Sequence, residues 1–173
     1  MSDAPTFGRY AEIPVVEGPR GRLPGPYKVW VYNPKLLRAA APLGQHFTPG
    51  QSALSERERE IAVLVITSRW HSGYPTAAHE KRGVEVGLPV AAVEAIVAGL
   101  PTSFPDAREQ VVYEVAMALA DGRLVSQGLY DRAIALLGHE SATDMIVLMG
   151  YYTAVSLTMN FYAVAAGTPG LAR

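Results

Sequence analysis

The sequence predicts an all-α protein, a single-domain bundle of about seven helices preceded by an extended N-terminal arm. Several segments place apolar residues at helical spacing, and most of them open with a Ser, Asp, Asn or Pro start signal. No segment has a convincing strand pattern. Hydrophobic residues make up 49% of the 173 residues and charged residues 18%, which is typical of a folded globular chain.

Composition separates the first 34 residues from the rest. Prolines at positions 5, 14, 19, 24, 26 and 34, with glycines at 8, 18, 21 and 25, disfavour helices and central strands. We therefore divide the chain into a Pro/Gly-rich arm, residues 1–34, and an all-helical domain, residues 35–173. The apolar residues of the arm indicate that it packs on a surface; they are Phe7, Tyr10, Ile13, Val15 and Val16.

The first helix of the domain is expected to begin at Pro34. Asn33 precedes it as a possible N-cap, and proline is favoured at the first helical position. Pro42 is expected to kink or end this helix, because a proline inside a helix removes a backbone donor.

The segment LSEREREIAVLVITSRW, residues 54–70, is the strongest local helix signal. Ser55 and Glu58 have the spacing of a capping box, and Glu56 adds a negative charge that suits the helix dipole. Every residue from Ile61 to Ile66 is apolar, so no polar face remains. The segment therefore predicts a buried helix.

Five further helices are expected. They run from Pro75 to near Gly87, from Pro89 to about Ala98, over the segment before Gly122, from Ser126 to Leu137, and from Ser141 to about Ala166. Ser141 followed by Asp144 suggests the same cap as Ser55 and Glu58.

Composition also excludes several function classes. The chain has 15 basic and 16 acidic residues without a basic stripe, so neither a nucleic-acid nor a membrane partner is expected. It has no cysteine, which excludes disulfides and thiolate catalysis. Because neither a secretory signal nor a bilayer-spanning apolar run is found, we expect a cytoplasmic protein.

Glu60 and His79 are the candidate acid–base residues. A carboxylate desolvated beside the apolar run can hold or deliver a proton near neutral pH. Alternatively, Glu60 lies at the exposed end of its helix and pairs with Arg57 or Arg59. His79 can act as acid, base or hydrogen-bond donor; alternatively, it is a capping or core histidine.

The connection before the His79 helix holds the candidate binding residues, since loops between rigid helices often supply site residues. They are Trp70, His71, Ser72 and Tyr74. A nucleophilic Ser72 would need an adjacent base and an oxyanion hole, and no G-x-S-x-G elbow is present. A hydrogen-bonding or helix-capping role for Ser72 is therefore favoured.

No metal site or cofactor is predicted. The four histidines, at positions 46, 71, 79 and 139, form no H-x-x-x-H pair, and phosphate and dinucleotide motifs are absent. Near the C-terminus, Tyr151, Tyr152 and the MNFY segment mainly indicate packing, although their polar tips could line a pocket or a subunit interface.

Residues 54–100 resemble the carboxymuconolactone decarboxylase family, which includes the alkyl hydroperoxide reductase D-like proteins. The shared features are the R-E-R-E lead, the buried helix, and His79 followed at steps of four by Gly83 and Gly87. The segments NPKLLRAAAPLG and DMIVLMGYYTAVSLTMNFY are also similar, so the resemblance covers about residues 33–165. It implies the alkyl hydroperoxide reductase D-like helical fold.

Peroxidase-type members of that family carry Cys-x-x-Cys-x-x-x-His and a glutamate twelve residues before the first cysteine. On this chain the histidine falls on His79 and the glutamate on Glu60, whereas the cysteines fall on Ser72 and Pro75. Serine cannot cycle through sulfenic acid and disulfide, and proline has no reactive group. Thiol-based peroxide reduction is therefore not expected here.

Decarboxylase members also lack the cysteine pair and act on a γ-carboxy lactone from aromatic catabolism. The resemblance thus implies a cofactor-free carboxy-lyase for a small carboxylated or lactone metabolite, with Glu60 and His79 catalytic. The implied substrate-binding residues are Trp70, His71, Ser72 and Tyr74.

Two alternatives to an enzyme remain open, a non-catalytic helical oligomer or binding module, and a protein that is described as peroxidase-like through family inheritance alone. Family members form trimers, hexamers or dimers of trimers. The resemblance therefore implies a homo-oligomer, in which the arm of residues 1–34 could wrap a neighbour.

Overall fold

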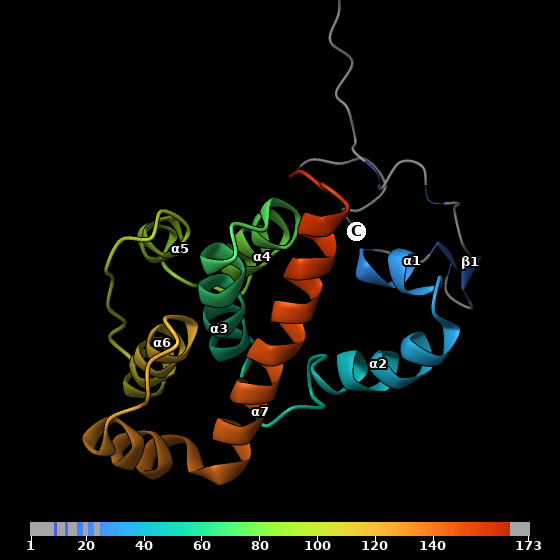
Figure 1. The fold of residues 1–173 in the computed structure, drawn as a ribbon. Coiled ribbons are helices and arrows are strands. Elements are labelled where there is room, and N and C mark those ends of the chain that lie inside the picture. Colours follow the sequence, from blue (N-terminus) through green and yellow to red (C-terminus); the bar gives the residue numbers. More distant parts are fainter. Residues whose placement is uncertain (1–8, 10–12, 14–16, 19–20, 23–24, 167–173) are drawn as a thin grey trace, which may run out of the picture.

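A computed structural model describes residues 9, 13, 17–18, 21–22 and 25–166 (Figure 1). In this part of the chain the fold is all-α, as predicted, apart from one antiparallel pair of two-residue strands. The strands are β1 (Glu17–Gly18) and β2 (Gly21–Arg22), and the helices are α1 (Pro26–Trp30), α2 (Pro34–His46), α3 (Glu56–Arg69), α4 (Gly73–Glu85), α5 (Val90–Val97), α6 (Ala107–Ala120) and α7 (Gln127–Phe161).

Helix α3 is the centre of the bundle. It packs against α4, α5, α6 and α7, and the residues from Ile61 to Leu64 are completely buried (Figure 1). Ser55 and Glu58 form the capping box that their spacing predicted. The buried helix predicted for this segment is thus confirmed.

Two crossed ion pairs fix the start of α3 against the start of α6. Arg57 donates to both carboxylate oxygens of Glu109, at 2.5 and 2.9 Å, and Arg108 donates from Nε to Glu58 at 2.6 Å. Both glutamates are buried, and each pair joins α3 to α6. These contacts hold the first turn of α3, and therefore Glu60 one turn later, in a fixed place.

Several helix limits differ from those expected. A kink or an end was expected at Pro42, and α2 does not end there but continues to His46; because none of its residues is buried, water can bind the carbonyl group that the proline leaves unpaired. Residues 26–30 form α1 rather than extended chain, since Pro26 suits a first helical turn. Helix α4 begins at Gly73, two residues before Pro75, which the first turn tolerates.

Helix α7 contains both of the last two predicted helices, joined at Gly138, whose φ of 72° breaks the helical geometry. It ends at Phe161, before the expected Ala166. The predicted cap at Ser141 is wrong, because the Ser141 hydroxyl donates to the Ala53 carbonyl and Asp144 also faces the α2–α3 loop.

Asp144 anchors that loop. Its carboxylate accepts hydrogen bonds from the Ser52 hydroxyl at 2.7 Å and the Ala53 amide at 2.9 Å, and lies 2.8 Å from His46 Nε2. Burial alone would raise the pKa of Asp144, but the bonds to His46, Ser52 and Ala53 outweigh it and lower the pKa.

We expect Asp144→Asn to lower the free energy of unfolding by about 1–3 kcal/mol at neutral pH. The folded-state pKa lies below the unfolded value of about 3.9, so this stabilisation is present above that value and is lost as the pH falls through the folded pKa. Urea unfolding of both proteins at several pH values measures it. A difference that does not shrink in acid would contradict the assignment, and the exposed Asp131→Asn is the control.

The described part of the arm packs on the C-terminal half of α7. Ile13, Val29 and Trp30 are buried against Val155 and Met159, as expected for Ile13. The Trp30 indole donates to the Thr158 hydroxyl at 3.1 Å. The other apolar arm residues, Phe7, Tyr10, Val15 and Val16, lie outside the described residues.

No helix in the described part of the chain is long and apolar enough to cross a membrane.

Candidate active site

Glu60 and His79 are brought together between α3 and α4. Glu60 is completely buried, and its Oε2 lies 2.5 Å from Nδ1 of His79. The imidazole is mostly buried, with 17% of its side chain exposed. The structure therefore pairs the two residues that the sequence singled out for acid–base chemistry.

Arg59 is the second partner of Glu60. Its Nη2 donates to Oε1 of Glu60 at 2.7 Å, and its Nη1 donates to the Phe47 carbonyl at 2.9 Å. One alternative for Glu60 was an exposed position with an ion pair to Arg57 or Arg59. The ion pair with Arg59 is present, but Glu60 is buried and not exposed. The two oxygens of the Glu60 carboxylate are therefore both engaged, Oε1 by Arg59 and Oε2 by Nδ1 of His79.

Tyrosines from α7 cover this pair. The Tyr152 ring makes a T-shaped contact with the His79 ring, with centroids 4.9 Å apart, and another with the Tyr151 ring. Burial raises the pKa of Tyr152, and the negative charge of Glu60 raises it further. The Tyr152 hydroxyl is therefore a neutral group beside the pair throughout the physiological pH range.

A second tyrosine pair continues the cluster toward α1. The Tyr27 and Tyr151 hydroxyls lie 2.9 Å apart, and burial followed by this hydrogen bond raises the pKa of Tyr151. Burial also raises the pKa of Tyr74, the first-turn tyrosine of α4. Gly44 of α2 lies directly against the Tyr27–Tyr151 pair.

We expect Gly44→Ala to break this pair and to cost about 1–3 kcal/mol of stability. The added Cβ would lie 2.1 Å from the Tyr27 hydroxyl and 2.6 Å from that of Tyr151, so both must move. Gly128→Ala is the matched control, because a Cβ there meets no described atom within 4 Å. If thermal unfolding shows equal midpoints for the two variants, Gly44 is not a packing constraint.

Buried hydroxyls surround the start of α4. Ser72 is completely buried, and its hydroxyl donates to the Ser156 carbonyl at 3.4 Å. In the described part of the chain, the Thr76 and Ser156 hydroxyls are buried without a hydrogen-bond partner. Such groups can bind the oxygens of a ligand or a water molecule. Ser72 is the N-cap residue of α4, but its hydroxyl makes no cap bond there; of the two roles expected, hydrogen bonding or capping, its side chain takes the first.

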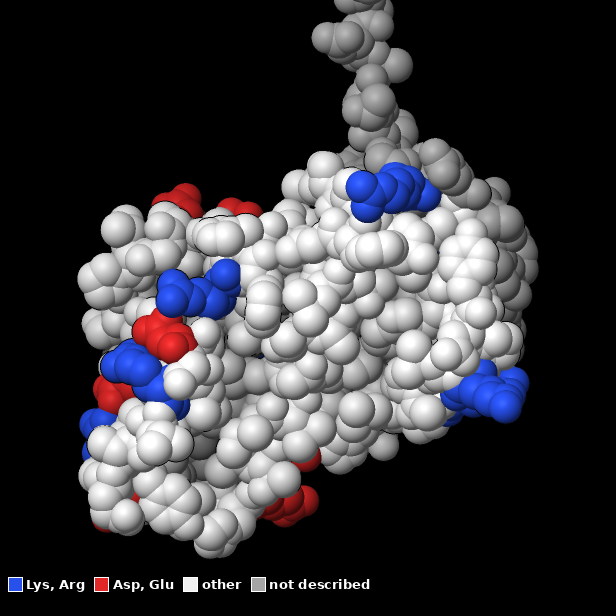
Figure 2. All heavy atoms as spheres, viewed as in Figure 1, with Lys and Arg blue, Asp and Glu red and all other residues white. Residues whose placement is uncertain are grey.

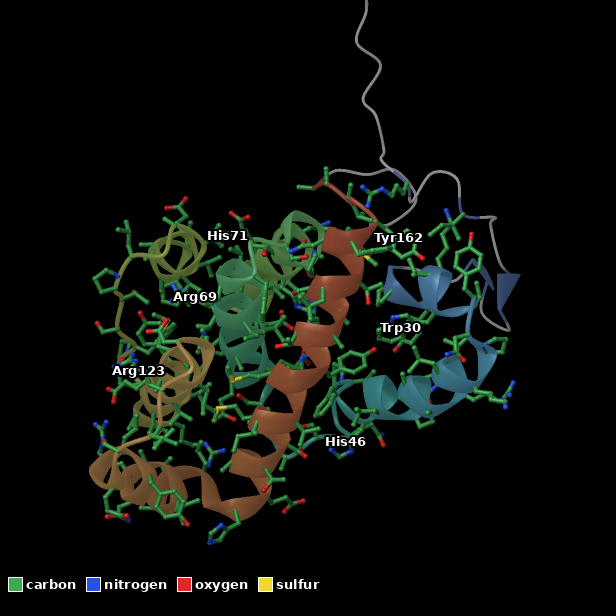
Figure 3. The ribbon with its side chains drawn as sticks, viewed as in Figure 1. Trp30, His46, Arg69, His71, Arg123 and Tyr162 are labelled. Atoms are coloured by element: carbon green, nitrogen blue, oxygen red, sulfur yellow. The ribbon has the colours of Figure 1, made fainter. Side chains whose placement is uncertain are left out.

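The other predicted binding residues do not form one site. Tyr74 packs into the aromatic cluster, whereas Trp70 is exposed and its carbonyl accepts a bond from Asn160. His71 is exposed, with a φ of 48° just past the end of α3. Figure 3 shows His71 beside Arg69 on the α5 side of the bundle, away from Trp30.

Two shallow cavities are present elsewhere. One, of about 140 Å³, includes His71, Arg69 and Asp121 in its lining, and the other, of about 170 Å³, lies at the bend of α7 beside Tyr130. Neither is lined by Glu60 or His79. Within the described residues no group of three His, Asp or Glu side chains is placed to hold a metal ion.

Sequence reasoning undervalued Arg59 and Tyr152 and did not identify Tyr27. Arg59 was considered only for an exposed Glu60, and Tyr152 mainly for packing. A helical step from Tyr152 to Val155 and Met159 could have placed the tyrosine on the buried side of α7. Nothing in the arm indicated that Tyr27 would reach Tyr151.

The fold and the site define an all-helical protein with a buried carboxylate–imidazole pair. Comparisons with protein-family models and with curated proteins found no match. Among solved structures, the chain is similar to an uncharacterized peroxidase-related protein from Silicibacter sp. TM1040, with a TM-score of 0.68 and 18% identity over 84% of this chain and 77% of that chain. At this identity the similarity shows a shared fold.

Proposed function

We propose that this chain is a cofactor-free acid–base enzyme of the decarboxylase or lyase type, acting on a small carboxylated or lactone metabolite. The observation that carries the proposal is the contact between buried Glu60 and Nδ1 of His79. With Nδ1 directed at Glu60, Nε2 is the ring nitrogen that exchanges a proton with a substrate. Glu60 orients the ring and stabilises its protonated form.

The chemistry requires one proton per turnover. The bond between the carboxylate and the substrate carbon breaks, and its electron pair remains on the substrate as an enolate-type anion while carbon dioxide leaves. His79 then donates a proton from Nε2 to carbon and regains one from water. The Thr76 and Ser156 hydroxyls are suited to stabilise the oxygen that carries the negative charge.

The absence of cysteine separates this proposal from thiol peroxidase chemistry. The structural neighbour is described as peroxidase-related, but Ser72 and Pro75 occupy the positions of the family's cysteines, and the whole chain has none. Neither side chain can be oxidised and reduced as a thiol is. A peroxidase-like name would therefore describe a shared fold and not the reaction.

The test is a panel of small carboxylated acids and lactones, including a γ-carboxy lactone. We expect turnover of at least one compound, seen as loss of ultraviolet absorbance, release of carbon dioxide and uptake of one proton per turnover. The exposed His139→Gln should retain the activity, whereas His79→Gln should lose it. Equal activity in both variants, or no turnover and no binding of any compound, would overturn the proposal.

A non-catalytic binding module is the second candidate. It is favoured by one observation, that neither described cavity is lined by Glu60 or His79. In this case compounds of the panel would bind and shift the His79 resonances without being converted.

A further inference from the structure

The C-terminal half of α7 exposes an uncharged face. No Asp, Glu, Lys or Arg occurs from Met145 to Ala166, although many of these side chains are exposed. Figure 2 shows a broad uncharged surface on the side where α7 runs, with charged residues mainly at its edges. A solvated surface helix normally carries charged residues on its outer side, so this face is suited to a partner.

The exposed residues of this face form a regular stripe. Its members, called the outer stripe, are Thr143, Val147, Gly150, Ala154, Leu157 and Phe161. Their spacing alternates between four and three residues, the pattern of a helix that packs along another helix. The stripe runs straight along one side of α7. Its ends, Thr143 and Phe161, are 18 residues apart, which is five full turns at about 100° per residue.

We propose that the outer stripe pairs with the same stripe of a second copy of this chain, antiparallel and across a two-fold axis near position 152. In this register Gly150 faces Ala154 of the second copy, and Val147 faces Leu157. The small residues at the centre let the two helices approach closely, and the larger side chains pack on either side of them. The spacing of the stripe is the same when it is read from either end, and a contact across a two-fold axis requires this symmetry.

The lack of charge on the outer stripe is consistent with its packing against a second copy of the chain. A two-fold contact places each face against itself, so a charged face would meet like charges near its axis. The outer stripe has none, and the nearest carboxylate, Asp144, is already bonded to Ser52 and Ala53.

The exposed apolar side chains of α7 supply part of the area that a dimer needs. Ile146, Val147, Leu157 and Phe161 are 51%, 40%, 48% and 66% exposed. A standard interface buries about 800 Å² on each partner. Helix α2 also exposes Leu36 and Leu43, and its end lies beside α7 through the Phe47–Tyr151 contact.

Charge placed on the stripe should separate the copies. We expect Ala154→Glu to reduce the mass measured by light scattering to that of one chain, while wild type measures as a dimer or a multiple of it. Ala135→Glu, the same change at an exposed position of α7 before the bend, is the control. A wild type that remains monomeric at high concentration, or an Ala154→Glu variant with wild-type mass, would overturn the proposal.

Cysteine cross-linking tests the register separately from stability, because the chain has no native cysteine. The double variant Gly150→Cys/Ala154→Cys should form a covalent dimer on oxidation, since a disulfide needs Cα atoms within about 7 Å. Each single variant should cross-link poorly. Efficient cross-linking of Gly150→Cys alone would mean that identical positions meet, and would overturn the antiparallel register.

Discussion

Replacing His79 with glutamine is expected to lower kcat by about 10²–10⁴-fold on the substrate identified in the panel. Glutamine keeps a polar group near Glu60 but cannot carry a proton to carbon. The folded protein should otherwise persist, because glutamine is close in size to histidine and can still bond to Glu60, although it loses the T-shaped contact with Tyr152. Steady-state kinetics with circular dichroism as a folding control measure the effect.

The dependence of kcat on Glu60 distinguishes proton transfer from a packing role. Glu60→Gln removes the negative charge that stabilises protonated His79 and keeps the shape of the side chain. We expect it to lower kcat and to change the pH profile, with KM nearly unchanged. A variant with an altered KM and the wild-type pH profile would indicate a purely structural Glu60, and the exposed Glu94→Gln is the matched control.

The second large effect is on stability. Glu60→Ala should lower the free energy of unfolding by about 3–5 kcal/mol, because it removes the carboxylate that compensates Arg59 in the interior. It also leaves a cavity where Glu60 was completely buried. Urea unfolding at neutral pH measures this loss.

Two comparisons test the cause of that loss. Glu56→Ala, which breaks a half-exposed pair with Arg82, should cost much less than Glu60→Ala. The double variant Arg59→Leu/Glu60→Leu should recover part of the stability, because apolar side chains can replace a buried ion pair. Equal losses in Glu60→Ala and Glu56→Ala would show that the buried charge is not the main cause.

Local signals made the helices predictable. The Ser55–Glu58 capping box and the Asn33 cap were confirmed because each bond lies within a few residues of the chain. The differences depended on surroundings that a local pattern does not report. Pro42 stays inside α2 because that helix is solvated, and the cap expected at Ser141 fails because Ser141 and Asp144 bond to a loop about 90 residues earlier in the sequence.

The candidate site was predictable only in part. Glu60 and His79 were identified from their positions around a buried helix, and the structure brings them into contact. Trp70 and His71 were grouped with them because they are close in sequence, but the end of α3 carries both to the exterior. The Tyr27–Tyr151 pair joins the arm to the last helix, and no sequence pattern encodes such a contact.

The central claim is tested most directly by finding which ring nitrogen of His79 carries the proton. This measurement needs no substrate. Nitrogen NMR of the histidine rings, assigned with His79→Gln, distinguishes a proton on Nδ1 from one on Nε2. We predict that the neutral ring of His79 carries its proton on Nδ1, facing Glu60, and that Glu60→Gln weakens this preference. A neutral His79 ring protonated on Nε2 in the wild type, with no response to Glu60→Gln, would contradict the acid–base pair.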